Sequence, residues 1–268
     1  MRTPTASSSS FEGSISDPAN PTSRSDADHG VVKPALSLVI LCYRSEDYAR
    51  DFLANALAMF ERYEIRDYEV VLVGCYVEGK QDRTPEIVRE LAAGDPRIRC
   101  CAEPKQGWMG WDLRFGLRAA RGDHIAFIDG DGQMPIDDVG RLYELIQTGS
   151  YDLVKTHRVV RQDGWKRKVM STVYNLMFRV LFPGLRAHDM NSKPKILTRE
   201  AYEKMDLRSD GWFIDAEMMI EARHHRLRIG ELPTEFHALR QRASFVSLAT
   251  SFEFVWGLLR ARVREFFR

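Results

Sequence analysis

The sequence predicts an α/β fold in which helices flank a mainly parallel central sheet. From residue 36 onward, short apolar runs alternate with longer amphipathic segments, which is the pattern of repeated strand–helix units. The first run, at 36–43, is continuously apolar, so both faces of the sheet are expected to be covered. An acidic motif directly follows the fourth run, where ligands bind in open parallel sheets.

Each expected element has its own local signal. Strands are assigned to residues 36–43, 68–75, 97–102, 124–129 and 151–156. Helices are expected between these strands. The first lies at about 46–60, the second begins at Thr84, the third ends at about residue 121, and the fourth begins at Pro135. Thr84 suits the N-cap and Pro85 the first helical position, and Gly122 ends the third helix.

The rest of the chain begins with a long amphipathic helix at 165–182. A strand at 195–197, a helix at 212–225, a strand at 227–232, a loop at 234–244 and a helix from about 247 to 267 follow. Residues 1–34 are rich in Ser and Pro and are expected to be disordered, because they have little to bury. The expected organisation is a tail at 1–34, one folded domain at 35–245 and an amphipathic basic helix at 246–268.

Composition excludes several classes of protein. The 268 residues include 39 Lys+Arg and 38 Asp+Glu, and this near balance argues against a nucleic-acid binder. The four cysteines are too few for a disulfide scaffold and fit no zinc pattern, so buried thiols in a reducing compartment are expected. No apolar stretch reaches the ~20 residues of a membrane span, and the start lacks a signal-peptide core. A cytoplasmic protein is expected, either soluble or peripheral on the inner membrane leaflet.

The strongest chemical signal is the run IDGDGQMP at 128–135. Asp129 and Asp131 are two residues apart at a strand end and can face one hard cation, Mg²⁺ or Mn²⁺, to which Gln133 adds a neutral oxygen. An EF-hand is excluded, because Met134 and Gly140 stand where that loop needs Gly and Glu. The alternative is an ordinary Asp-Gly turn, which the position after a covered strand disfavours.

Two common phosphate-binding loops are missing from the sequence. Neither G-x-x-x-x-G-K-[S/T] nor G-x-G-x-x-G occurs. A carboxylate-held cation on an α/β sheet without these loops suggests a nucleotide diphosphate that is bound through the cation.

Several stretches, in order along the chain, resemble the family 2 glycosyltransferases, especially the dolichol-phosphate mannose synthase-like branch. They are LVILCY at 38–43 with Glu46, TPEIVREL at 84–91, GLRAARGDHIAFIDGDGQ at 116–133, DMNSKPKI at 189–196, WFIDAE at 212–217 and RLRIGELP at 226–233. The resemblance covers roughly residues 36–247. It implies a GT-A fold, a nucleotide-diphosphate sugar donor and inversion by direct displacement.

The resemblance also implies roles on the donor side. Asp129 and Asp131 would hold the Mg²⁺ or Mn²⁺ that bridges the donor diphosphate, with Asp131 counted as catalytic and Gln133 close to the metal. The implied donor-binding residues are Leu41, Tyr43, Glu46, Glu78, Asp129, Gly130, Arg240 and Arg242. The family's acid at the end of the second strand is absent here, so Glu78 or Asp82 would have to replace it. UDP and GDP therefore both stay open.

On the acceptor side, Arg158 matches an arginine that approaches the acceptor phosphate in the lipid-phosphate branch. Asp189, Asn191 and Ser192 align with a polar acceptor-side motif. Asp215 and Glu217 fall in a late acidic motif and are the other catalytic candidates, of which one is expected to face the site. A hydroxyl acceptor needs such a base, whereas a phosphate acceptor does not.

Two helices have the composition of interfacial helices. The helix at 165–182 and the segment 252–267 are amphipathic and basic, so they can rest on an anionic membrane surface. The alternative is packing on the sheet or in a dimer. A homo-oligomer and a membrane partner both stay open.

The sequence therefore predicts a metal-dependent inverting glycosyltransferase that moves a hexose to a polyprenyl phosphate. One rival keeps the enzyme class but uses a hydroxyl acceptor on a glycan or small metabolite. A second rival is a catalytically silent GT-A scaffold, which the altered second-strand motif favours and the intact Asp-Gly-Asp motif disfavours.

Overall fold

The structure is a computed structural model that describes residues 33–161, 165–185, 187–236 and 248–267. From residue 33 onward these residues belong to one compact unit. The predicted tail at 1–34 lies almost wholly outside the described residues, and so does most of the expected loop at 234–244.

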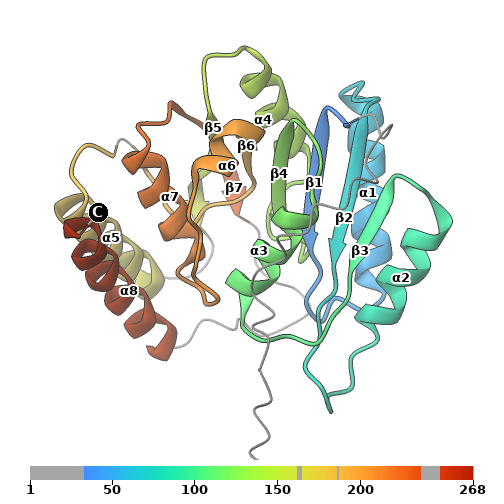
Figure 1. Cartoon of the computed structure of the whole chain (residues 1–268), viewed down its shortest axis with the longest axis horizontal. Coiled ribbons are helices and arrows are strands. Elements are labelled where there is room, and N and C mark those ends of the chain that lie inside the picture. The colour runs from blue at the N-terminus through green and yellow to red at the C-terminus, as the bar shows by residue number, and fades with distance from the viewer. Residues whose placement is uncertain (1–32, 162–164, 186, 237–247, 268) are drawn as a thin grey trace, which may run out of the picture. The chain divides into compact units, whose positions relative to one another are not determined.

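Within the described residues, seven strands form one sheet (Figure 1). They are β1 (Leu36–Leu41), β2 (Tyr68–Val73), β3 (Ile98–Cys101), β4 (His124–Asp129), β5 (Leu153–Arg161), β6 (Lys195–Thr198) and β7 (Ile229–Phe236), in the spatial order β3-β2-β1-β4-β6-β5-β7. The first four strands are parallel to one another. β6 is antiparallel to both β4 and β5, and β7 is parallel to β5, so the sheet is mainly parallel as expected.

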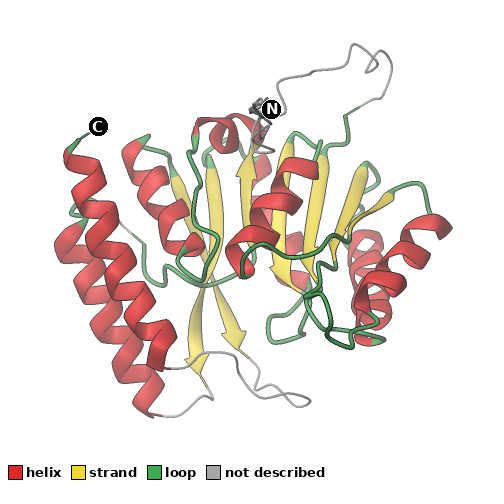
Figure 2. Cartoon of the chain, turned by 60° about the horizontal axis from the view of Figure 1, so that its bottom comes forward, coloured by secondary structure: helices red, strands yellow, loops and turns green. Residues whose placement is uncertain are grey.

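Helices cover both faces of this sheet (Figure 2). They are α1 (Tyr48–Arg62), α2 (Thr84–Gly94), α3 (Met109–Ala119), α4 (Asp137–Gln147), α5 (Trp165–Leu181), α6 (Arg199–Lys204), α7 (Ile214–His224) and α8 (Leu248–Phe266). The sequence missed the short helix α6. It also ended the last strand too early, since β7 continues to Phe236.

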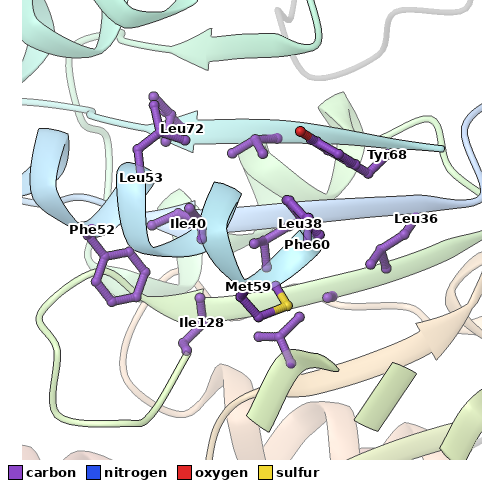
Figure 3. Close-up of a cluster of buried hydrophobic side chains, with 14 of the residues drawn as sticks. Leu36, Leu38, Ile40, Phe52, Leu53, Met59, Phe60, Tyr68, Leu72 and Ile128 are labelled. Atoms are coloured by element: carbon purple, nitrogen blue, oxygen red, sulfur yellow. The ribbon is translucent and has the colours of Figure 1, made fainter. Parts of the chain in front are cut away.

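The continuous apolar strands are buried on both faces, because each face carries its own core. One core packs α1, α2 and α4 on the sheet through side chains such as Phe52, Met59 and Phe60 (Figure 3). The other packs α3, α5, α7 and α8 on the opposite face and includes Leu113 and Phe178. At about 25 cal/mol per Å² of apolar surface, these two cores supply the main stabilisation of the fold.

The register of the strands aligns their carboxyl ends at one edge of the sheet. Leu41 at the end of β1 pairs with Val73 of β2 on one side and with Asp129 of β4 on the other. The chain moves outward from β1 to β2 and β3, and then returns to place β4 on the other side of β1. Such a reversal of strand order is the place where ligands bind in open α/β sheets.

The expected buried thiols are confirmed for three cysteines. Cys42, Cys75 and Cys101 are buried, and all four cysteines are free. Burial raises the pKa of Cys42 and of Cys75 to about 12, so both are inert thiols near neutral pH.

Candidate active site

Asp129 begins the acidic loop at the point where β4 meets β1. It is the last residue of β4, and the N–H of Gly130 donates to the carbonyl of Leu41 at 2.9 Å. The loop then closes on itself, since the N–H of Gln133 donates to Asp131 Oδ1 at 3.0 Å. The loop therefore presents Asp129, Asp131 and Gln133 at the carboxyl edge of the sheet, as predicted.

Gly132 gives this loop its tight turn. Its φ is +72°, and a Cβ built there would lie 2.0 Å from the hydroxyl oxygen of Tyr48. Only glycine combines this left-handed conformation with so close a neighbour. Asp131 is near the same tyrosine and helps burial to raise the pKa of Tyr48.

The donor set at this edge suits magnesium or manganese. Over the described part of the chain, no three His, Cys, Asp or Glu side chains converge as a metal-binding group. Magnesium is usually bound by one or two carboxylates, with water and substrate phosphates completing its shell. Two carboxylates and one amide in an open loop fit that arrangement.

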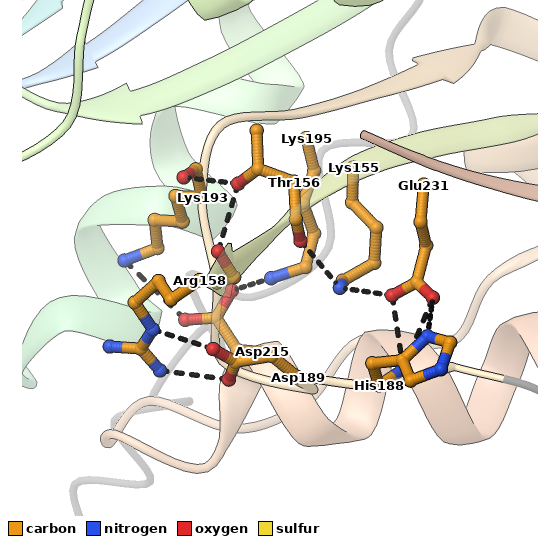
Figure 4. Close-up of polar contacts among 10 residues, drawn as sticks. Lys155, Thr156, Arg158, His188, Asp189, Lys193, Lys195, Asp215 and Glu231 are labelled. Carbon is orange, nitrogen blue, oxygen red and sulfur yellow. Dashed lines mark hydrogen bonds and ion pairs between the residues drawn. The ribbon is translucent and has the colours of Figure 1, made fainter. Parts of the chain in front are cut away.

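Lysines and carboxylates form a buried cluster (Figure 4), which contacts Asp129 through Lys193. Lys193 Nζ is 2.9 Å and 3.0 Å from the two carboxylate oxygens of Asp129, and 3.4 Å from Asp215 Oδ2. Lys195 donates to the other oxygen of Asp215. Lys193 thus joins Asp215, at the start of α7, to Asp129 of the acidic loop. Lys195 contacts Asp215 but not Asp129.

These contacts shift the protonation equilibria of the cluster. Burial opposes the charge on Asp215, yet the ammonium groups of Lys193 and Lys195 hold its pKa below the ordinary value. Burial likewise opposes the charge on Lys193, but Asp129 and Asp215 raise its pKa. Burial lowers the pKa of Lys195 to about 8, against the attraction of Asp215. Asp215 is therefore ionised and a weak base near neutral pH.

A second group of polar side chains extends the cluster toward β5 and β7. Lys155 is fully buried and donates to Glu231 Oε1 at 2.8 Å, and His188 contacts the same carboxylate. Thr156 and Ser192 share a hydrogen bond of 2.8 Å. These contacts fix the segment 188–195, from which Lys193 and Lys195 project.

The predicted acceptor-side residues come together around this segment. Arg158 binds Asp189 with two parallel hydrogen bonds of 2.6 and 2.8 Å, which is the planar pairing that guanidinium groups favour. The buried Oδ1 of Asn191 has no hydrogen-bond partner within the described ranges. Arg158, Asp189, Asn191 and Ser192 therefore lie in one region, next to the lysine cluster.

The two late acidic residues point to different places, as their spacing on a helix requires. Asp215 faces the lysine cluster. Glu217 Oε2 instead accepts backbone hydrogen bonds from Arg208 at 3.0 Å and Ser209 at 2.7 Å, and Arg264 of α8 is 3.4 Å from its other oxygen. Glu217 therefore holds the loop before α7.

The donor-side residues of β1 lie beside the first helices. Tyr43 follows β1, and its ring covers the ammonium group of Lys105 at 3.9 Å. The N–H of Glu46 donates to Thr84 Oγ1 at 3.0 Å, which ties the loop after β1 to the start of α2. Leu41 accepts the hydrogen bond from the N–H of Gly130, so these two residues are neighbours.

The proposed substitutes for the missing second-strand acid occupy different settings. Glu78 is exposed in a turn. Asp82 Oδ1 accepts from the N–H of Thr84, the first residue of α2, at 3.0 Å. At Gly74 a side chain would meet Val88 at 2.7 Å, so the end of β2 has no room for a larger residue there. Arg240 and Arg242 lie outside the described residues.

Sequence reasoning missed three of the ionisable residues at this edge. Lys193 and Lys195 flank Pro194 before an apolar strand, and a lysine in such a strand needs a buried acid as its partner. The position of Lys195 at the start of an apolar strand was therefore a sequence signal for a buried ion pair. Asp112 of α3 is paired with Lys105 beneath Tyr43, and its Oδ1 has no partner among the described residues. Burial raises the pKa of Asp112 to about 6 although Lys105 lowers it.

Comparisons with known proteins agree with this architecture. The glycosyl transferase family 2 model matches residues 37–209. Glycosyltransferase AglD of Haloferax volcanii is 30% identical over 224 residues, covering 81% of this chain and 35% of that protein. Dolichyl-phosphate beta-glucosyltransferase ALG5A of Trichomonas vaginalis is 27% identical over 218 residues, covering 76% and 66% respectively. The chain thus spans about one third to two thirds of the length of these relatives.

A solved structure shares the fold. Glucosyl-3-phosphoglycerate synthase from Mycobacterium tuberculosis, in complex with Mn²⁺, UDP and phosphoglyceric acid, superposes with a TM-score of 0.65 and 20% identity, covering 85% of this chain and 78% of that one. The expected GT-A fold is thereby confirmed. The match of the family model over residues 37–209 shows that this chain belongs to glycosyl transferase family 2.

Proposed function

We propose that this protein is a metal-dependent inverting glycosyltransferase that moves a hexose from a nucleotide-diphosphate sugar to a polyprenyl phosphate. The main support for the proposal is the position of Asp129 and Asp131 at the carboxyl ends of β1 and β4, where Asp129 contacts the buried ammonium group of Lys193. When bound there, Mg²⁺ or Mn²⁺ would offset the negative charge on the departing nucleoside diphosphate. The likeness to a structure that was crystallised with Mn²⁺ and UDP supports this choice of cofactor and donor.

The contacts of the two late acids support a phosphate acceptor over a hydroxyl acceptor. A general base works best with a pKa near the working pH. The pKa of Asp215 is lowered by its two lysines, and Glu217 accepts hydrogen bonds from the loop before α7. An anionic phosphate oxygen can attack the anomeric carbon without a base, so Asp215 is assigned a positioning role.

The surroundings of Arg158 also suit an anionic acceptor. Its guanidinium group binds Asp189, which belongs to the same segment 188–195 as Lys193 and Lys195 (Figure 4). A guanidinium group binds phosphate with the same fork that it offers to Asp189 here. The name of the relative ALG5A, a dolichyl-phosphate glucosyltransferase, agrees with this acceptor class.

A surface for the membrane is available on α5 and α8. Among the described residues, no helix is long and apolar enough to cross a bilayer. The two helices pack against each other at one end of the molecule (Figure 2). Each carries a stripe of exposed apolar side chains, namely Val173, Leu176 and Val180 on α5, and Trp256, Leu259, Val263 and Phe266 on α8. We propose that this face rests on anionic lipid, because apolar stripes beside arginines favour such an interface.

Release of nucleoside diphosphate tests the proposed reaction. UDP- and GDP-hexoses are screened with Mg²⁺ or Mn²⁺, with and without a polyprenyl phosphate. We expect release that requires both the cation and the lipid phosphate, and that is lost in Asp131→Ala. Asp51→Ala, which removes an exposed carboxylate of α1, is the matched control and keeps the activity.

The other outcomes separate the rivals. Release that is unaffected by the lipid would support a hydroxyl acceptor or hydrolysis, and activity should then depend on Asp215 or Glu217. Wild-type levels of release in Asp131→Ala would refute the metal site. The absence of release with every donor would favour the silent scaffold.

A further inference from the structure

Lys193 connects the proposed metal ligand to the acid of α7. Its side chain is only 4% exposed, and its Nζ contacts both oxygens of Asp129 at 2.9 and 3.0 Å as well as Asp215 at 3.4 Å. Lys195, two residues later, contacts Asp215 but not Asp129. The two lysines therefore carry the same charge in the same cluster, yet only Lys193 competes for the acidic loop.

A divalent cation and this ammonium group make conflicting demands on Asp129. Magnesium binds carboxylate oxygens at about 2.0–2.1 Å, whereas the ammonium group already contacts both oxygens of the same carboxylate. The two cations also repel each other at such short range. Binding of the metal alone must therefore weaken the contact between Lys193 and Asp129.

The displaced ammonium group has other anions within reach. Asp215 is already a neighbour, and the diphosphate of a donor that is bound through the metal would lie beside Asp129. An ammonium group is an effective point-charge ligand for phosphate. The same lysine that opposes the metal alone would thus favour the metal together with a diphosphate.

We propose that Lys193 couples metal binding to donor binding, by competing with the cation for Asp129 and then pairing with the donor diphosphate. This inference rests on the proposed metal site at Asp129 and goes beyond it, because it assigns the coupling to one residue. A coupling free energy of this kind is reciprocal, so it can be measured from either ligand. Such a device keeps the cation weakly bound until a nucleotide sugar arrives.

The test compares Lys193→Met with Lys195→Met, which removes the same charge two residues away. Binding of Mn²⁺ alone is measured by the electron paramagnetic resonance signal of free Mn²⁺. We expect Lys193→Met to bind Mn²⁺ about 10-fold more tightly than wild type, and Lys195→Met to stay within about 3-fold. A gain in affinity cannot arise from a damaged fold.

A second measurement uses UDP and GDP at saturating Mn²⁺. Lys193→Met should bind whichever nucleotide wild type prefers about 10-fold less tightly, because the phosphate loses a cation, and Lys193→Arg should retain most of this affinity. Opposite signs for metal and nucleotide are the signature of the coupling. Changes of the same sign, an unchanged affinity for Mn²⁺, or an equal gain in Lys195→Met would overturn the inference.

Asp129→Asn separates this inference from the proposed function. If Asp129→Asn binds Mn²⁺ as wild type does, the cation is held elsewhere and both proposals fail. If Asp129→Asn abolishes binding while Lys193→Met leaves it unchanged, the metal site stands and only the coupling fails.

Discussion

Asp215→Asn should destabilise the protein far more than the loss of an exposed carboxylate. Asp215 is 3% exposed and contacts Lys193 and Lys195, and Lys195 is fully buried. Removing one partner of a buried ion pair costs about 3–5 kcal/mol, because a buried charge is left without compensation. Lys193 keeps Asp129, so the penalty is expected near the lower limit, about 3 kcal/mol.

The pH dependence of this penalty follows from Lys195. Its pKa is about 8 in the folded protein, below its ordinary value, so wild type releases the proton of Lys195 as pH rises through 8. Without Asp215 the pKa of Lys195 falls further, so the variant releases this proton at a lower pH than wild type does. At pH 9 Lys195 is mostly neutral in both proteins, so the penalty should be smaller at pH 9 than at pH 7, by up to about 1.4 kcal/mol.

Urea unfolding at pH 7 and pH 9 is the assay, with Asp137→Asn as the control. Asp137 pairs with Arg62 on the surface, where both side chains are about half exposed. The loss of such a pair costs about 0–1 kcal/mol. A penalty for Asp215→Asn below 1 kcal/mol, or one that is equal at both pH values, would refute the assignment of Asp215 as the anion that compensates the buried lysines.

Three further predictions concern the loop, a buried acid and the helix face. Gly132→Ala should weaken Mn²⁺ binding about 10-fold, because the new Cβ would clash with the hydroxyl oxygen of Tyr48 at 2.0 Å. Gly149→Ala is the control and should not weaken binding, since Gly149 has a similar φ of +71° but open space around it. Equal effects of the two variants in a binding titration would contradict this. The pKa of Asp112 is raised to about 6, so the folded state takes up a proton before the unfolded state as pH falls. The free energy of unfolding of wild type should therefore rise by about 1 kcal/mol relative to Asp112→Asn between pH 7 and pH 5. Parallel urea-unfolding profiles of the two proteins would exclude this. Trp256→Glu should reduce flotation with anionic vesicles, while Trp108→Glu, at a similarly exposed tryptophan outside α5 and α8, should float as wild type does. If both variants float like wild type, the helix face does not bind lipid.

The sheet and the acidic loop could be predicted because their signals are local. The strand at 36–43 is a continuous apolar run, and β1 to β4 lie within the four ranges predicted between 36 and 129. Asp129 and Asp131 were placed at the sheet edge by the same pattern, since the carboxyl ends of parallel strands meet there.

The partners of the buried lysines could not be predicted, because these contacts are long-range. Lys193 and Asp129 are 64 residues apart in sequence, and Lys195 and Asp215 are 20 apart. Nothing local indicates that β6 enters the sheet antiparallel between β4 and β5 and brings Lys195 under α7. Glu217 was likewise indistinguishable from Asp215 in sequence, and only the backbone groups around it show that it holds a loop.

Transfer of labelled hexose into a lipid-extractable product is the direct test of the proposed reaction. Wild-type protein, a nucleotide-diphosphate hexose, Mn²⁺ and a polyprenyl phosphate are incubated, and the organic phase is assayed with and without chelator. We expect a polyprenyl-phosphate hexose of inverted anomeric configuration, which is absent with chelator and in Asp131→Ala. Label that stays in the aqueous phase while the nucleoside diphosphate is released, or a product of retained configuration, would contradict it.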